Sequence, residues 1–314
     1  MDLDKGFDQR NEMELLARYV EGTLNSELSR TIREIENKHV VSFEEELTQL
    51  PSAQRNVELE KVVVAFKRPS LLVKNGRLEQ TLSEEWGALL DLHADDLGRA
   101  MAAVGRIELK NHESLEWNGT GFLIAGNRIV TNRHVAKDFV KRNGTGFEWK
   151  TNDYSGKYVT ANVDFFEEHK NPEEKEFKIS DVEYLANDDA ADLAILTLAE
   201  SPDIAPLEMF YDAEPGRMIV AAGYPWKDSR ATSKLEEIHL RIFKDIYNVK
   251  RAAPGQILEN NGDRLHHDCS TLKGNSGSAC IDLETGTLVG VHYGGSTNHN
   301  RAVTSRKLAE IAGL

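Results

Sequence analysis

The sequence predicts a mostly β protein with an α-helical N-terminal region, and two observations support this fold class. Apolar residues recur every three or four positions from Leu16 to Ile35, which places them on one face of a helix. After residue 104, short apolar runs alternate with Gly, Asn and Asp turns, a spacing typical of a β-sandwich or a β-barrel. The change of pattern predicts a boundary near residue 100, with a helical region over 1–100 and a β domain over 101–314.

The helical region is expected to contain three further elements. Residues 43–50 continue the helical pattern and stop at Pro51, and residues 62–66 are expected to form a short strand or buried turn. A helix is expected over residues 84–101, and its inward residues are Trp86, Leu89, Leu90, Leu97 and Met101. The functions open to this region are an adaptor for a regulatory partner, an oligomerisation element, an inhibitory cap, or packing for the β domain.

Strands of the β domain are expected wherever a short apolar run is bounded by turn residues. These runs are 121–125, 129–131, 193–198, 218–222, 279–283 and 288–293.

Composition excludes several classes of protein. The chain has 38 Lys and Arg residues against 52 Asp and Glu residues, a formal net charge of −14. Nucleic-acid-binding proteins carry clustered Lys and Arg, and no dense basic stripe occurs here, so nucleic acid is not expected as a partner. No stretch approaches the ~18 consecutive apolar residues that span a bilayer, and the first residues lack the features of a signal peptide. We therefore expect a cytoplasmic protein in which Cys269 and Cys280 are reduced core residues.

The segment Gly274-Asn275-Ser276-Gly277-Ser278 carries the sharpest chemical signal. Glycines on both sides of Ser276 permit a tight turn that exposes the serine hydroxyl. The amide N–H groups of Gly274 and Ser276 can then point at one spot, where a tetrahedral oxyanion would form. A Gly/Ser loop without a catalytic role is the alternative for this segment taken alone.

Two further candidates stand at the ends of apolar runs. His134 follows the run 129–131, where a strand end would hold its imidazole rigidly at the edge of a cleft, although a lone histidine is more often structural. Asp192 enters the run 193–198, where its carboxylate would be desolvated unless a group such as an imidazole N–H pairs with it. A solvated turn is the alternative for Asp192.

These alternatives weaken when the three residues are taken together. The order along the chain is His134, Asp192, Ser276, and each residue stands at a strand end of one β-rich domain. Serine is a weak nucleophile that needs a base, and the base needs an orienting acid.

At these residues the sequence resembles the trypsin-like (chymotrypsin-fold) serine peptidases. The resemblance lies in Gly119-Thr120-Gly121-Phe122, Thr131-Asn132-Arg133-His134, Asp192-Leu193-Ala194-Ile195-Leu196 and Gly274-Asn275-Ser276-Gly277-Ser278, and it covers roughly residues 104–303. Residues 103–109 and 248–251 are similar to bacterial intracellular members, which often carry an N-terminal extension.

The resemblance implies a double β-barrel chymotrypsin-like fold, divided near residues 200–210, with the active site between the barrels. It implies a serine endopeptidase that cleaves proteins or peptides through an acyl-enzyme and needs no cofactor. His134 would be the general base, Asp192 its orienting acid and Ser276 the nucleophile. The amides of Gly274 and Ser276 would form the oxyanion hole. A catalytically silent or gated peptide-binding module and an esterase are the rival functions.

The expected specificity pocket contains Thr271, His292 and Gly294. No aspartate stands where the resemblance places the one that selects basic side chains, so cleavage after Lys or Arg is not expected. Thr271 and His292 match positions that glutamyl endopeptidases use to hold a P1 carboxylate, and a hydroxyl and an imidazole can both donate hydrogen bonds to an acid. Acidic P1 and small or apolar P1 both stay open, because His292 is alternatively a structural histidine of the barrel.

Asn275 is a departure from the digestive-type members, which carry an aspartate that pairs with a new N-terminus after zymogen cleavage. We therefore expect control from the N-terminal region or from active-site loops. The resemblance to the intracellular subgroup implies a role in a bacterial defence or signalling system.

A metal site is not expected at His266-His267-Asp268-Cys269. Four adjacent residues on an extended segment point to alternating sides and cannot close a tetrahedral zinc site alone.

Overall fold

The computed structural model describes residues 68–81, 84–227, 236, 239–240, 242–295 and 299–314. The chain divides into two compact units, Met1–Leu59 and Glu60–Leu314, and every element below belongs to the second. The elements predicted at residues 16–35, 43–50 and 62–66 lie outside the described residues. The boundary at residue 100 and a partner-binding role for residues 1–100 therefore stay predictions.

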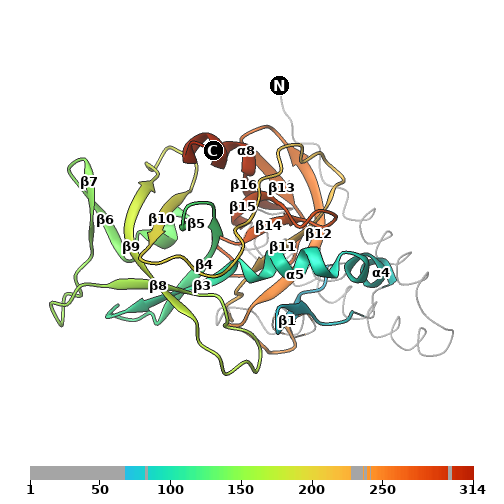
Figure 1. Cartoon of the computed structure of the whole chain (residues 1–314), viewed down its shortest axis with the longest axis horizontal. Coiled ribbons are helices and arrows are strands. Elements are labelled where there is room, and N and C mark those ends of the chain that lie inside the picture. Colours follow the sequence, from blue (N-terminus) through green and yellow to red (C-terminus); the bar gives the residue numbers. More distant parts are fainter. Residues whose placement is uncertain (1–67, 82–83, 228–235, 237–238, 241, 296–298) are drawn as a thin grey trace, which may run out of the picture. The chain divides into compact units, whose positions relative to one another are not determined.

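The first barrel is a closed antiparallel sheet of six strands in the order β10-β5-β4-β3-β8-β9. Its strands are β3 (Val104–Lys110), β4 (Trp117–Ile124), β5 (Arg128–Thr131), β8 (Thr160–Asp164), β9 (Glu176–Leu185) and β10 (Ala194–Leu198). The turn between β4 and β5 contains Gly126 and Asn127, whose positive φ angles of 80° and 60° suit these two residue types. In Figure 1 this barrel is mostly green to yellow.

The second barrel follows the connection over residues 199–217 and is mostly orange to red in Figure 1. Its strands run in the order β11-β14-β15-β16-β13-β12, and β12 pairs with β11 to complete the ring. The bounds are β11 (Met218–Gly223), β12 (Arg251–Asn260), β13 (Arg264–His267), β14 (Ala279–Asp282), β15 (Leu288–Gly295) and β16 (Asn300–Thr304). The predicted mostly β fold with two barrels is confirmed.

Smaller elements lie around the barrels. The hairpin β1 (Leu71–Lys74) and β2 (Arg77–Leu78) extends the second sheet, because β1 pairs with β12. A separate hairpin joins β6 (Val140–Asn143) to β7 (Gly146–Trp149). The C-terminal helix α8 (Ser305–Ala312) begins at Thr304, whose hydroxyl oxygen accepts a hydrogen bond from the amide of Lys307.

The helix predicted over residues 84–101 forms as two helices, α4 (Glu84–Leu92) and α5 (Ala94–Ala102). They are separated at His93, whose φ of −109° and ψ of 19° are not helical. The inward face is confirmed: Trp86, Leu90, Leu97 and Met101 are buried, and Leu89 is partly buried against the same core.

Candidate active site

His134 and Asp192 come together because the strands that carry them are neighbours. Thr131 at the end of β5 pairs with Ala194 at the start of β10. The short helix α6 (Arg133–Ala136) follows β5 and carries His134, and Asp192 lies two residues before β10. The two side chains lie 2.6 Å apart, from Nδ1 of His134 to Oδ2 of Asp192.

The hydrogen bonds to Asp192 fix the orientation of the imidazole. A carboxylate can only accept, so the Nδ1–H of His134 donates to it and Nε2 is left as the basic nitrogen. The backbone amide of His134 donates to Oδ1 at 3.1 Å, and Nδ2 of Asn132 donates to the backbone carbonyl of Asp192 at 3.0 Å.

Charge around Asp192 keeps its carboxylate ionised. Burial raises the pKa of Asp192, but the hydrogen bonds from His134 and the nearby Arg133 guanidinium outweigh it and hold the pKa below its usual value. Nε of Arg133 lies 3.7 Å from Oδ1 of Asp192. The pair therefore combines an ionised acid with an imidazole that is 45% exposed and available to solvent or substrate.

Ser276 lies in the loop before β14, between two glycines with positive φ, Gly274 (86°) and Gly277 (85°). A Cβ at Gly277 would overlap the carbonyl oxygen of Thr120, and one at Gly274 would overlap the carbonyl oxygen of Tyr224. Both positions require glycine because of the backbone conformation and the close approach.

Thr120 on β4 of the first barrel binds this loop from the other side. Its amide donates to the carbonyl of Ser276 at 2.8 Å, and its hydroxyl donates to the carbonyl of Gly274 at 2.9 Å. Gly119 shows how near the loop lies to α6, since a Cβ there would be 2.7 Å from Val135 Cγ2 and 3.0 Å from the Ser276 carbonyl oxygen. The structure thus brings the Ser276 loop against the helix that carries His134.

Some backbone amides of this loop donate hydrogen bonds within the protein, and others do not. Asn275 N–H donates to Leu272, Gly277 N–H to His292 and Ser278 N–H to Asn275. Among the described residues, the N–H groups of Gly274 and Ser276 donate no hydrogen bond. These two are the amides predicted for the oxyanion hole, and they stay available for an oxygen of a bound molecule.

His292 lies on β15, and its backbone carbonyl accepts the hydrogen bond from Gly277 of this loop. Only 3% of the residue is exposed. Its Nδ1 is 3.1 Å from Nε2 of His267 on β13, and Nδ1 of His267 accepts from the amide of Cys269. Because Nδ1 of His267 is an acceptor, its Nε2 carries the proton and donates to His292. The remaining proton of His292 is therefore on Nε2, which forms no hydrogen bond among the described residues.

The two hydrogen-bonded histidines, His267 and His292, form a relay in which burial keeps both imidazoles neutral. Burial lowers the pKa of His267 to about 3, and burial together with the neighbouring His267 lowers the pKa of His292 well below its usual value. Nε2 of His292 is thus a neutral N–H donor at neutral pH.

The other two residues of the expected specificity pocket, Thr271 and Gly294, offer no free side-chain donor of the kind that His292 has. Nδ2 of Asn300 donates to the carbonyl of Cys269 at 2.6 Å, so its Oδ1 is the acceptor that receives the hydroxyl proton of Thr271 at 3.0 Å. Thr271 therefore uses its donor within the protein. A Cβ at Gly294 would have nothing within 4 Å, so Gly294 borders open space.

His267 and Asn300 are site residues that the sequence interpretation missed. The alternation of β13 could have identified His267, because it turns His267 into the buried interior and His266 outward, where His266 stacks on His299 at 3.8 Å between ring centres. Within the described part of the chain, no three His, Cys, Asp or Glu residues are grouped as metal ligands. Cys269 and Cys280 are buried free thiols.

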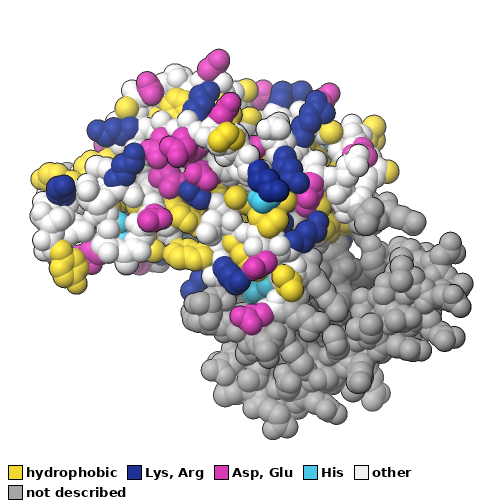
Figure 2. Space-filling model, turned by 90° about the horizontal axis from the view of Figure 1, so that it is seen from below, with side chains coloured by type: hydrophobic (Ala, Val, Ile, Leu, Met, Phe, Trp, Pro, Cys, Tyr) yellow, Lys and Arg dark blue, Asp and Glu magenta, His cyan; other side chains and the backbone are white. Residues whose placement is uncertain are grey.

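Two surface properties also bear on function. No helix within the described residues is long and apolar enough to cross a membrane. On the face shown in Figure 2, several acidic side chains gather in one cluster, and basic side chains are scattered around it among the described residues.

The chain is similar to several known proteins. Residues 119–291 match the family described as trypsin-like peptidase domain. A probable serine protease of Lysobacter enzymogenes is 27% identical over 278 residues, which is 78% of this chain and 71% of the relative. A serine endoprotease structure from Yersinia pestis has 16% identity and a TM-score of 0.46, covering 69% of this chain and 64% of that one. An inactive mutant structure from M. tuberculosis H37Rv has 20% identity and a TM-score of 0.42, covering 69% and 88%.

Proposed function

Because the chain belongs to the family of trypsin-like peptidase domains and is therefore a serine endopeptidase, we propose that His134, Asp192 and Ser276 form its catalytic triad. The observation that carries this proposal is the His134–Asp192 hydrogen bond, beside a loop that leaves the amides of Gly274 and Ser276 unused.

The geometry supports an acyl-enzyme mechanism. His134 Nε2 takes the proton of the Ser276 hydroxyl as its oxygen attacks the scissile carbonyl, and the two free amides bind the oxyanion. The imidazolium, stabilised by Asp192, then protonates the leaving amine as the peptide C–N bond breaks. Water, activated by His134 in the same way, hydrolyses the ester and releases the acid and Ser276.

We expect Ser276→Ala to lower peptide hydrolysis by about 10⁴-fold or more, because the nucleophile is lost. The fold should be retained, since the change removes one half-buried hydroxyl. The measurement is a mass-spectrometric cleavage profile of a mixed peptide library. Ser180→Ala is the matched control, because Ser180 is an exposed serine on β9. Full activity of Ser276→Ala would refute the triad, and hydrolysis of esters but not peptides by the wild type would favour the esterase function.

We also propose that the S1 pocket selects an acidic P1 residue through Nε2 of His292. The support is the chain of hydrogen bonds from Cys269 through His267 to His292, which presents a neutral donor that has no hydrogen-bond partner among the described residues. A neutral N–H binds a carboxylate without burying a second full charge, which avoids the larger desolvation cost. The Thr271 hydroxyl already donates its proton to Asn300, so Thr271 contributes by holding the Asn300 side chain in place.

His292→Leu is expected to lower kcat/KM for cleavage after Glu by about 10–100-fold, the cost of one hydrogen bond to a charged group. Cleavage after Ala or Leu should change little. The preference of the wild type for Glu should not vary between pH 6 and pH 9, because burial keeps both histidines neutral. His266→Leu is the control, since His266 faces away from the relay. An equal loss for every P1 residue would show that His292 is structural.

A cytoplasmic location and a role in a bacterial defence system stay predictions.

A further inference from the structure

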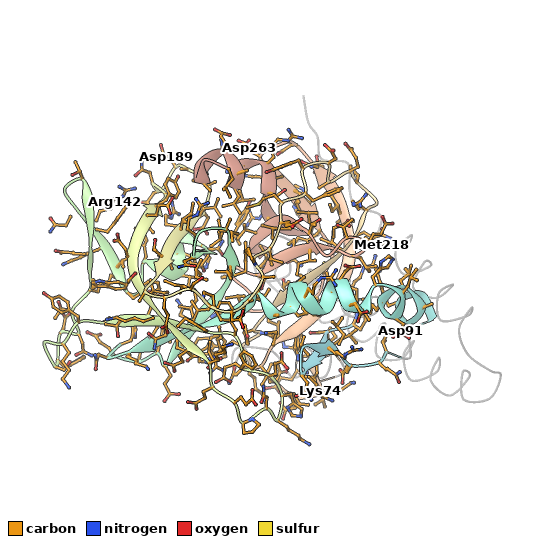
Figure 3. All side chains as sticks on the ribbon, viewed as in Figure 1. Lys74, Asp91, Arg142, Asp189, Met218 and Asp263 are labelled. Carbon is orange, nitrogen blue, oxygen red and sulfur yellow. The ribbon has the colours of Figure 1, made fainter. Side chains whose placement is uncertain are left out.

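A cavity of about 330 Å³ lies beside the helix that carries His134. It is bounded by the end of α6, the hairpin β6–β7 and the segment that leads from β9 toward Asp192. Its lining consists of Lys137, Val140, Lys141, Arg142, Lys150, Leu185, Ala186, Asn187 and Asp188. Figure 3 labels Arg142 and, one residue beyond the lining, Asp189, which lie toward the upper left of the molecule.

The charge of this cavity is opposite to that of the chain. Four cationic side chains and a single carboxylate line it, whereas the whole chain has a net charge of −14. Lys141 is paired outside the cavity with Glu148 at 2.8 Å. Within the described residues, Arg142 and Lys150 pair with no carboxylate, and Arg142 donates to the carbonyl of Leu185. Arg142 and Lys150 therefore give the cavity positive charge that no carboxylate of the described residues pairs with.

Asp188 shows that the cations around this cavity can bind a carboxylate. Its exposed carboxylate lies 2.5 Å from Nζ of Lys137 and 3.4 Å from the guanidinium of Arg133. The Lys137 ammonium, with Arg133 behind it, holds the pKa of Asp188 below its usual value. Arg133 and Lys137 both belong to the segment that carries His134, so the cavity lies on the same segment as the proposed general base.

We propose that this cavity is an exosite for an acidic side chain of the peptide substrate, away from the scissile bond. The enzyme then prefers an acidic segment rather than a single acidic residue. This inference rests on the proposed peptidase function, and acidic P1 selection by His292 is independent of it. Substrate carboxylates bind beside Lys150 and Arg142, or displace Asp188 from Lys137.

The test compares peptides that share one P1 residue and carry either three Glu or three Gln residues on one side of it. The wild type should cleave the Glu peptides with a kcat/KM about fivefold higher, since each exposed ion pair contributes up to about 1 kcal/mol. The preference should disappear at 1 M salt, where the Debye length is about 3 Å. Arg142→Gln/Lys150→Gln should abolish it, whereas Asp188→Asn should strengthen it by freeing Lys137.

Lys178→Gln, an exposed lysine on β9 outside the cavity, is the matched control and should keep the wild-type preference. Binding of the same peptides to Ser276→Ala, measured by fluorescence anisotropy, reports on the exosite without catalysis, so an inactive enzyme does not obscure the result. Equal binding and cleavage of Glu and Gln peptides, or a preference that survives in the double variant, would overturn the proposal. So would an oligonucleotide that competes as strongly as the acidic peptide, because it would assign the cavity to nucleic acid.

Discussion

Arg133 places a positive charge beside the candidate catalytic acid. Its Nε is 3.7 Å from Oδ1 of Asp192, and the side chain is only 16% exposed, so solvent screens this interaction weakly. The guanidinium is held on its other side by the carbonyl of Asn187 and by Asp188. A cation at this point helps to lower the pKa of Asp192 and so favours the ionised carboxylate. We therefore expect Arg133 to act through Asp192, as a positioning residue of the proposed triad.

We expect Arg133→Gln to move the acidic limb of the kcat/KM–pH profile upward by about 0.5–1 pH unit, because roughly 1 kcal/mol of attraction between the guanidinium and the ionised Asp192 carboxylate is removed. The alkaline plateau should be retained and Arg133→Lys should restore the limb. The measurement is kcat/KM from pH 5 to pH 9. The same exchange at Arg99, which pairs with the exposed Asp96 on α5, is the control. An unchanged limb with a uniformly lower plateau would contradict electrostatic tuning and indicate a structural role.

At the scale of single residues, the sequence predicts the triad but only part of the pocket. His134, Asp192 and Ser276 stand in local motifs, so their roles follow from neighbours in the chain. The environments of His292 and Thr271 depend instead on His267 and Asn300, respectively, which two other strands supply. The engagement of Thr271 with Asn300 was not predictable, because 29 residues separate them and no local pattern links a hydroxyl to that amide.

At the scale of elements, strands marked by apolar runs were predictable and β12 was not. Pro254 and Gly255 interrupt its pattern, and a proline normally argues against a central strand. The structure accommodates Pro254 because β12 changes neighbours there: residues 251–252 pair with β1, and residues 257–260 pair with β13. Pro254 still pairs with β11 on one edge of β12. On the other edge it lies between the residues paired with β1 and those paired with β13, where no ladder hydrogen bond needs its missing N–H. Gly255 is required by close contact, since a Cβ there would lie 2.6 Å from Oδ1 of Asp268.

The break between α4 and α5 was also beyond the sequence pattern. The inward residues keep their periodicity across His93, so the pattern predicts one continuous helix. The backbone nevertheless leaves the helical region at His93, while the apolar residues of both helices still pack into one core.

At the scale of the molecule, one buried lysine joins four parts of the second unit. Nζ of Lys250 donates to the carbonyls of Met101 at the end of α5 and of Phe165 after β8, at 3.0 and 2.7 Å. It also lies 3.6 Å from the carboxylate of Glu168, which accepts the amide of Gly76 in the β1–β2 turn. Since Lys250 directly precedes β12, both barrels, the hairpin and α5 meet at this one ammonium group.

Lys250→Met should lower the free energy of unfolding at pH 7 by about 3–5 kcal/mol, because it leaves Glu168 buried without its cation. Burial lowers the pKa of Lys250 to about 8, whereas an unfolded lysine titrates near 10.5. Between these values the unfolded chain binds more protons, so the wild type gains stability with rising pH through this group and the variant does not. The difference measured by urea unfolding should therefore widen from pH 8 to pH 10.5. The exposed Lys157→Met variant should show no such trend, and a difference that narrowed would mean that the charged form of Lys250 stabilises the fold.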